Sequence, residues 1–116
     1  MSIDEITDVE VPVLKTALNR DHAWDRIAVT YQVTNPAPPW KSSLDGMCDV
    51  LDCSADALAF KDRRDEEDAL AETQYADLPH PESQLVALAH SLIARGVIGE
   101  SALAERMETV RARLQA

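Results

Sequence analysis

PESQLVALAHSLIARG, residues 81–96, carries the clearest pattern in this 116-residue chain and decides its fold class. Pro81 and Glu82 suit a first helical turn, and Gly96 is a common type of helix stop. Between these ends, apolar residues recur at the three- and four-residue spacing of one helical face; they are Leu85, Leu88, Ala89, Leu92 and Ile93. The stretch predicts a helix with one buried stripe.

A second helix is predicted directly after it. A short turn at Val97-Ile98-Gly99 leads into Glu100, and the pattern continues to about Leu114. Its apolar residues repeat at intervals of four, three and four, and they are Leu103, Met107, Val110 and Leu114. Helices joined by so short a turn are typical of an antiparallel hairpin, so we expect an all-α domain that ends in one.

Two more helices are predicted upstream of this hairpin. Pro39-Trp40 opens a helix from about residue 40 to 52, and its apolar face consists of Leu44, Met47, Cys48 and Leu51. Ser54 is a suitable N-cap for a short helix that holds Leu58. The later part of this helix, residues 61–68, is densely charged and predicts a solvated face or a contact surface.

The first 38 residues show weaker patterns. Residues 1–10 predict an extended arm, mobile or docked on a partner, and Pro12 opens a helix to about residue 19. Residues 29–34 alternate in a β-like way, which leaves their structure ambiguous. Residues 35–39, NPAPP, predict an extended linker because residues before proline avoid the α region. We therefore divide the chain into an N-terminal part, residues 1–38, and a helical domain, residues 39–116.

The composition excludes several classes of partner. The chain has 21 acidic and 11 basic side chains, a formal net charge of -10, which disfavours binding to nucleic acid. No apolar run approaches the length of a membrane span, and the acidic N-terminus is unlike a secretory signal. These features predict a cytoplasmic protein, in which Cys48 and Cys53 stay reduced.

Catalytic and metal-binding motifs are not found. His22, His80, His90 and the cysteines Cys48 and Cys53 supply donor atoms, but none forms a C-x-x-C, H-x-x-x-H or H-E-x-x-H motif. Cys48 lies on the apolar face of its helix, where a thiol is inert, and Cys53 is expected to be more exposed. We therefore predict neither a metal or cofactor site within this chain nor an enzyme that acts alone.

Arg63 and Arg64 stand within an otherwise acidic run, residues 62–68. They could form ion pairs along a solvated helix face. Alternatively, one guanidinium could reach across an interface and hold an anionic or oxyanion-like group of a partner. The run itself leaves both interpretations open.

Three segments in order resemble the N-terminal helical domain of nitrile hydratase β-subunits and the related subunit of thiocyanate hydrolase. They are the Pro39-Trp40 helix entry, the basic segment FKDRR at residues 60–64, and residues 75–114, which are similar to the terminal helical hairpin of the family. The resemblance covers about residues 39–114. It implies a β-type subunit, a part of a lyase that hydrates a nitrile to an amide or of a hydrolase that acts on thiocyanate.

The resemblance also implies partners and a site. In the family, cobalt(III) or iron(III) is held by a cysteine claw of the α-subunit, and arginines from the β side hydrogen-bond the oxidised cysteines. Arg63 is the best match to such an arginine and Arg64 is the alternative one residue on. This chain lacks the C-x-x-C-S-C claw and the β-barrel domain of full β-subunits, which implies a metal-bearing α-type partner and a possible separate barrel subunit. An accessory protein, such as an activator or metallochaperone, and a plain helical interaction module are the alternatives.

Overall fold

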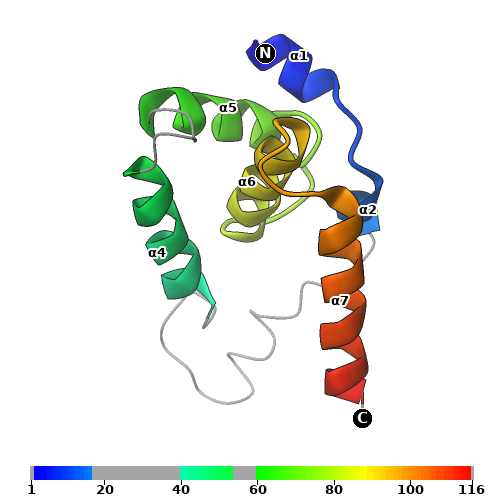
Figure 1. Ribbon diagram of the computed structural model, residues 1–116. Coiled ribbons are helices and arrows are strands. Elements are labelled where there is room, and N and C mark those ends of the chain that lie inside the picture. Colours follow the sequence, from blue (N-terminus) through cyan, green and yellow to red (C-terminus); the bar gives the residue numbers. More distant parts are fainter. Residues whose placement is uncertain (1, 17–39, 54–59, 116) are drawn as a thin grey trace.

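A computed structural model of the chain describes residues 2–16, 40–53 and 60–115, and within these ranges the regular structure is entirely helical (Figure 1). The predicted all-α fold class is confirmed for these residues. The helices are α1 (Ile3–Asp8), α2 (Pro12–Lys15), α4 (Lys41–Asp52), α5 (Phe60–Glu72), α6 (Glu82–Ala94) and α7 (Glu100–Gln115). None of the described helices is both long and apolar enough to cross a membrane.

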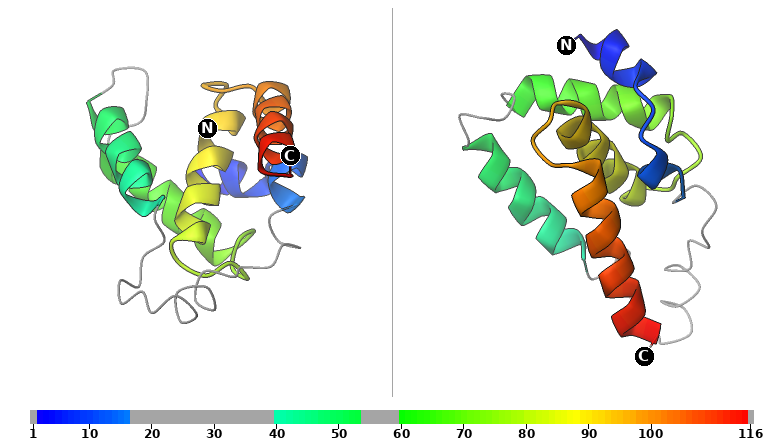
Figure 2. Two further views of the ribbon diagram at one scale, coloured as in Figure 1. Left: turned by 90° about the horizontal axis from the view of Figure 1, so that it is seen from below. Right: turned by 45° about the vertical axis from the view of Figure 1, so that its right-hand side comes forward.

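Helix α6 is the central element, because the core packs on two sides of it (Figures 1 and 2). On one side, α1, α2, α5 and the loop after α5 meet it in a cluster built from Ile6, Val11, Leu14, Leu70, Tyr75, Leu78, Val86 and Ala87. On the other side, Leu44 of α4 packs with Leu88 and Leu92. Residues on both sides of the predicted boundary at residue 38 therefore share one core.

The predicted ends of α6 are confirmed, and its C-terminus shows why Gly96 stops it. The backbone N–H of Gly96 donates to Ile93 O at 3.0 Å, and that of Val97 donates to Leu92 O at 2.9 Å. This is the Schellman arrangement, which needs a residue in the left-handed region after the helix. Gly96 adopts φ 76°, which costs a residue without Cβ little.

Helix α7 leaves this turn in a direction that the sequence did not indicate. In Figure 1 and in the right view of Figure 2 it runs away from the body of the fold, and in the left view of Figure 2 it is seen nearly end-on beside α6, so it does not run back along α6. Leu103 in its first turn packs against the core, but Val110 is 38% exposed and Leu114 is 82% exposed. The helix at residues 100–114 is confirmed, while the side-by-side packing expected of a hairpin is not what these views show.

The N-terminal arm is helical where an extended arm was predicted. Ser2 caps α1 by accepting a hydrogen bond from the Glu5 backbone N–H, and Ile6 is completely buried. The prediction of a free or partner-docked arm was therefore wrong for these residues. The physical reason is that Ile6 fills the core between α5 and α6 of its own chain.

The other predicted elements agree in part. Helix α4 matches the predicted helix at residues 40–52, with Leu44 buried and Met47 47% exposed. Helix α5 contains the charged run at residues 61–68, as predicted, and it ends at Glu72. Helix α2 begins at Pro12 as predicted and is described to Lys15. The alternating stretch at 29–34, the proline linker, His22, the Ser54 cap and Leu58 lie outside the described residues.

Candidate functional site

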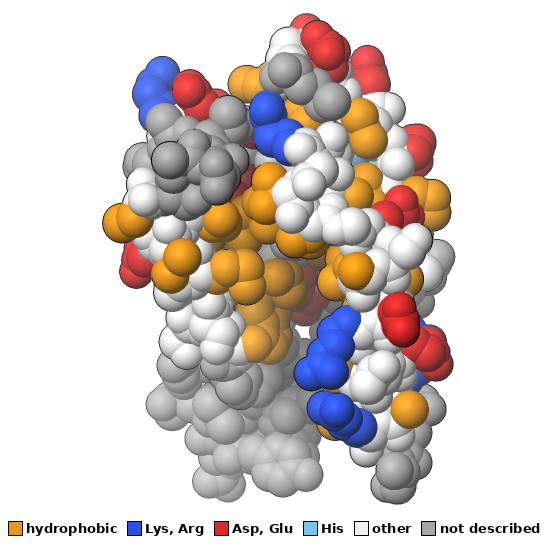
Figure 3. All heavy atoms as spheres, in the orientation of Figure 1, with side chains coloured by type: hydrophobic (Ala, Val, Ile, Leu, Met, Phe, Trp, Pro, Cys, Tyr) orange, Lys and Arg blue, Asp and Glu red, His pale blue; other side chains and the backbone are white. Residues whose placement is uncertain are grey.

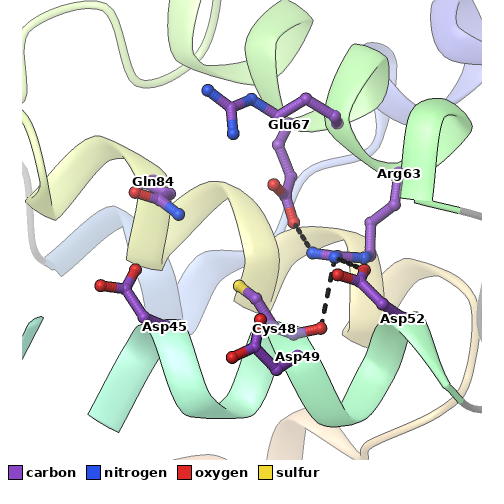
Figure 4. Close-up of a pocket in the computed structure, with 8 residues that line it drawn as sticks. Asp45, Cys48, Asp49, Asp52, Arg63, Glu67 and Gln84 are labelled. Carbon is purple, nitrogen blue, oxygen red and sulfur yellow. Dashed lines mark hydrogen bonds and ion pairs between the residues drawn. The ribbon is translucent and has the colours of Figure 1, made fainter. Parts of the chain in front are cut away.

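Arg63 is held inside the protein between α4 and α5, with only 4% of its side chain exposed (Figure 4). Its Nη1 donates to Glu67 Oε1 at 2.9 Å, one turn along α5. Its Nη2 forms an ion pair with Asp52 of α4 and a long hydrogen bond of 3.5 Å to Cys48 O. The guanidinium therefore joins the two helices.

Electrostatics keeps this arginine charged. Desolvation on burial works to lower the pKa of Arg63, but the hydrogen bond to Asp52 and the charge of Glu67 outweigh it, so the pKa is raised. Burial also raises the pKa of Glu67, against the opposing effect of Arg63. Within the described residues, Arg63 Nε is a buried donor with no hydrogen-bond partner. One donor of a fixed cation is thus left unused.

A cavity of about 210 Å³ opens beside this arginine. Successive turns of α4 line it with Asp45, Asp49 and Asp52 (Figure 4). The whole lining, Asp45, Cys48, Asp49, Asp52, Arg63, Arg64, Glu67 and Gln84, has four carboxylates against two guanidiniums. Such a pocket attracts cations and repels free anions such as phosphate.

Arg64 occupies a different environment from its neighbour. Its side chain is 59% exposed, and its Nε lies 3.4 Å from the Asp68 carboxylate, one turn along α5. Asp68 is itself 62% exposed. An exposed pair of this kind contributes at most about 1 kcal/mol, so Arg64 can exchange partners at small cost.

A second buried charge, Glu66, joins α5 to α6. Its side chain is 1% exposed and accepts a hydrogen bond from Ser91 Oγ at 2.6 Å. Arg95 donates to the same carboxylate through Nε at 3.2 Å and Nη2 at 2.7 Å. This hydrogen bonding, with Glu66 as the first cause, raises the pKa of Arg95. No sequence pattern indicates this site, because its partners are distant in sequence.

A third polar network is centred on His90, which is fully buried. Its Nε2 lies 2.9 Å from Ile6 O, and a carbonyl can only accept, so Nε2 carries the proton. Nδ1 then accepts from Tyr75 OH at 2.6 Å. Burial lowers the pKa of His90 and raises that of Tyr75. The histidine is a neutral bridge between α1, α6 and the loop after α5.

The structure separates the donor atoms that the sequence analysis considered for a metal. Cys48 is half-buried, Cys53 is exposed, and both are free thiols. His80 lies exposed in the turn before α6, whereas His90 is committed to its two hydrogen bonds. Residues 2–16, 40–53 and 60–115 contain no group of three His, Cys, Asp or Glu side chains placed to hold a metal ion.

Comparisons with protein-family models, curated proteins and solved structures found no match to this chain. The geometry above therefore stands on its own, and the resemblance to nitrile hydratase β-subunits rests on the three sequence segments alone. Of the two arginines that those segments single out, the structure makes one a buried cross-link and leaves the other accessible.

Proposed function

We propose that this chain is a non-metal, β-type subunit of a nitrile hydratase-like enzyme of the cytoplasm. Such an enzyme would hydrate a nitrile to an amide, or hydrolyse a related small substrate such as thiocyanate. The chain would pack on an α-type subunit that holds cobalt(III) or iron(III), with a possible separate β-barrel subunit. The observation that carries the proposal is the arginine pair on α5, one residue buried and fixed and the next one exposed.

The two arginines suit different roles in an interface. Arg63 already forms ion pairs with Asp52 and Glu67, and removing a buried partner from such a pair costs about 3–5 kcal/mol. Arg63 is therefore suited to fixing α5 against α4. Arg64 gives up only an exposed ion pair when it turns toward a partner. We therefore assign contact with the partner to Arg64 and positioning to Arg63, a reversal of the order that the sequence resemblance gives.

The chemistry of a guanidinium fits the role assigned to Arg64. Its planar donors match compact oxyanions, and a sulfenate or sulfinate oxygen on an oxidised cysteine is such an acceptor. A hydrogen bond of this kind would orient and tune the ligands of the partner's metal ion without contacting the metal itself. The metal supplies the Lewis-acid chemistry, and this chain supplies a positioned donor.

A plain helical interaction module is the second candidate, favoured by the apolar stripe of α7. Val110 and Leu114 are exposed at the end of a helix that extends from the body. This feature fits any assembly in which α7 is covered by another protein, and it does not depend on the family.

Co-expression with the gene products encoded beside this chain tests the proposal. We expect a tag on this chain to retain a stoichiometric complex with a C-x-x-C-S-C subunit, cobalt or iron by elemental analysis, and turnover of nitrile or thiocyanate. Retention of only the apo metal subunit, with release after metal loading, would assign the chain to the accessory proteins instead. A complex without metal or turnover would leave the interaction module as the function.

One substitution and its control in the assembled enzyme then test the role assigned to Arg64. Arg64→Lys should lower kcat by about tenfold or more with assembly intact, because lysine cannot form the planar two-donor contact. Lys61→Arg, an exchange of one cation for another at an 86% exposed position of the same helix, is the matched control. Equal turnover of wild type, Arg64→Lys and the control would contradict the assignment.

A further inference from the structure

Helix α7 presents a coiled-coil type of surface for most of its length. Its apolar residues repeat at four, three and four residues, the spacing of positions d and a of a heptad; they are Leu103, Met107, Val110 and Leu114. Their exposure increases along the helix, from Leu103, which packs against the core, to Leu114, which is 82% exposed. The stripe is thus anchored at one end and uncovered at the other.

Further hydrophobic side chains gather beside α7. Figure 3 shows a hollow between α4 and α7 in which hydrophobic side chains gather, with blue basic side chains on the α7 side. Exposed apolar residues gathered in this way are typical of a surface that another protein covers.

The charges that flank the stripe are all of one sign. In the heptad set by Leu103 and Met107, Arg106 and Arg113 fall at position g, and position e holds Ala104 and Arg111. The glutamates of α7 fall at positions a, b and f; they are Glu100, Glu105 and Glu108. In a chain of net charge -10, all three arginines of this helix therefore border its apolar stripe.

We propose that the apolar stripe of α7 docks an amphipathic helix of another protein, with acidic residues beside its apolar face. Charge complementarity selects this occupant, because flanking charges decide which helices pair. A second copy of α7 would place arginine against arginine at these flanking positions, which disfavours self-pairing. The proposal deepens the proposed role as a subunit, and rests on it in requiring a protein partner.

A peptide-binding experiment on the full chain tests this surface without any metal subunit. The probe is a three-heptad peptide with Ile and Leu at a and d and Glu at e and g, and its counterpart carries Lys at e and g. Isothermal titration should show the Glu peptide binding at least about tenfold more tightly than the Lys peptide. Equal binding of the two peptides, or binding of neither, would overturn the proposal whether or not the enzyme complex assembles.

Matched variants locate the binding to this face. The double substitution Arg106→Gln/Arg113→Gln should lower the affinity for the Glu peptide by about fivefold, because two flanking ion pairs are lost. Ser101→Glu/Ala112→Glu changes the net charge equally at exposed positions away from the stripe and should leave binding unchanged. An equal loss of peptide affinity in both double variants would overturn the proposal. Two other results would also overturn it: dimerisation of the chain through Val110, and cosedimentation with anionic vesicles that depends on Arg106. Far-UV circular dichroism confirms that each variant keeps its helices.

Discussion

Replacing Arg63 by methionine tests the buried ion pair that fixes α5 on α4. Methionine keeps the length of the aliphatic stem but removes the charge and every donor. Asp52 is 28% exposed and can turn to water, whereas Glu67 is 4% exposed and loses its partner at 2.9 Å. The cost of the substitution therefore falls mainly on Glu67.

The loss of stability is limited by protonation, because a buried carboxylate without a partner can become neutral. Glu67 can take up a proton, and relative to the ordinary glutamate pKa of 4.5 this costs about 1.36 kcal/mol for each pH unit above that value. At pH 7 the limit is about 3.4 kcal/mol, within the range of about 3–5 kcal/mol known for broken buried pairs. At pH 5.5 the same limit is about 1.4 kcal/mol. The sign agrees with linkage, since a carboxyl whose folded-state pKa is raised contributes stability that is lost as pH rises.

Urea unfolding followed by far-UV circular dichroism measures both values. We expect Arg63→Met to lower the free energy of unfolding by about 3 kcal/mol at pH 7 and by about 1 kcal/mol at pH 5.5. Arg64→Met is the matched control on the exposed neighbour and should change stability by less than about 0.5 kcal/mol. A loss that is the same at both pH values, or an equal loss in Arg64→Met, would refute the reasoning about Glu67.

Three further predictions concern α1, His90 and the stop of α6. Ile6→Ala should cost about 2–5 kcal/mol of unfolding free energy by calorimetry, because Ile6 is fully buried, while Ile3→Ala at a 41% exposed site should cost under about 0.5 kcal/mol; equal effects would mean that α1 is not part of the fold. Because burial lowers the pKa of His90 from 6.5, the unfolded state binds the proton first, so stability should fall as pH drops below 6.5 until the folded-state pKa is reached. In urea titrations across this range His90→Gln should show a smaller pH-dependent loss than wild type, and an identical slope would contradict the network. Gly96→Ala should lower the free energy of unfolding by about 1–2 kcal/mol, since φ 76° strains a residue with Cβ. An unchanged melting temperature would show that the turn can rearrange.

The sequence was sufficient where the deciding signals are local. Helix α6 could be placed within a residue or two because its proline start, its apolar spacing and Gly96 lie within the helix itself or next to it. The extent of its burial could not be predicted, because contacts with elements on both sides bury Val86, Ala87 and His90 in addition to the predicted stripe. A period of 3.6 residues indicates one apolar face, but a central helix uses more than one.

Interactions between distant residues account for what the sequence analysis missed. The pairing of Arg63 with Glu67 has a sequence signal, since the two stand four residues apart on one helix. That this pair is buried depends on α4, and the contacts of Glu66 with Ser91 and Arg95 span 25 and 29 residues. In the same way, nothing in the first ten residues shows that Ile6 O will accept from His90, 84 positions away.

The same networks explain why α7 is the element available to a partner. One ion pair ties α4 to α5, Glu66 ties α5 to α6, and His90 ties α6 to α1. Helix α7 is joined to the body near its start, where Glu100 accepts from the Val13 backbone N–H at 3.2 Å and Leu103 meets the core. Toward its C-terminus the apolar residues gain less from their own chain, because Val110 is 38% exposed and Leu114 is 82% exposed. Burying these side chains against another protein would release further hydrophobic free energy. The C-terminal part of α7 has the fewest contacts with its own chain, and it is therefore the part that binding would stabilise most.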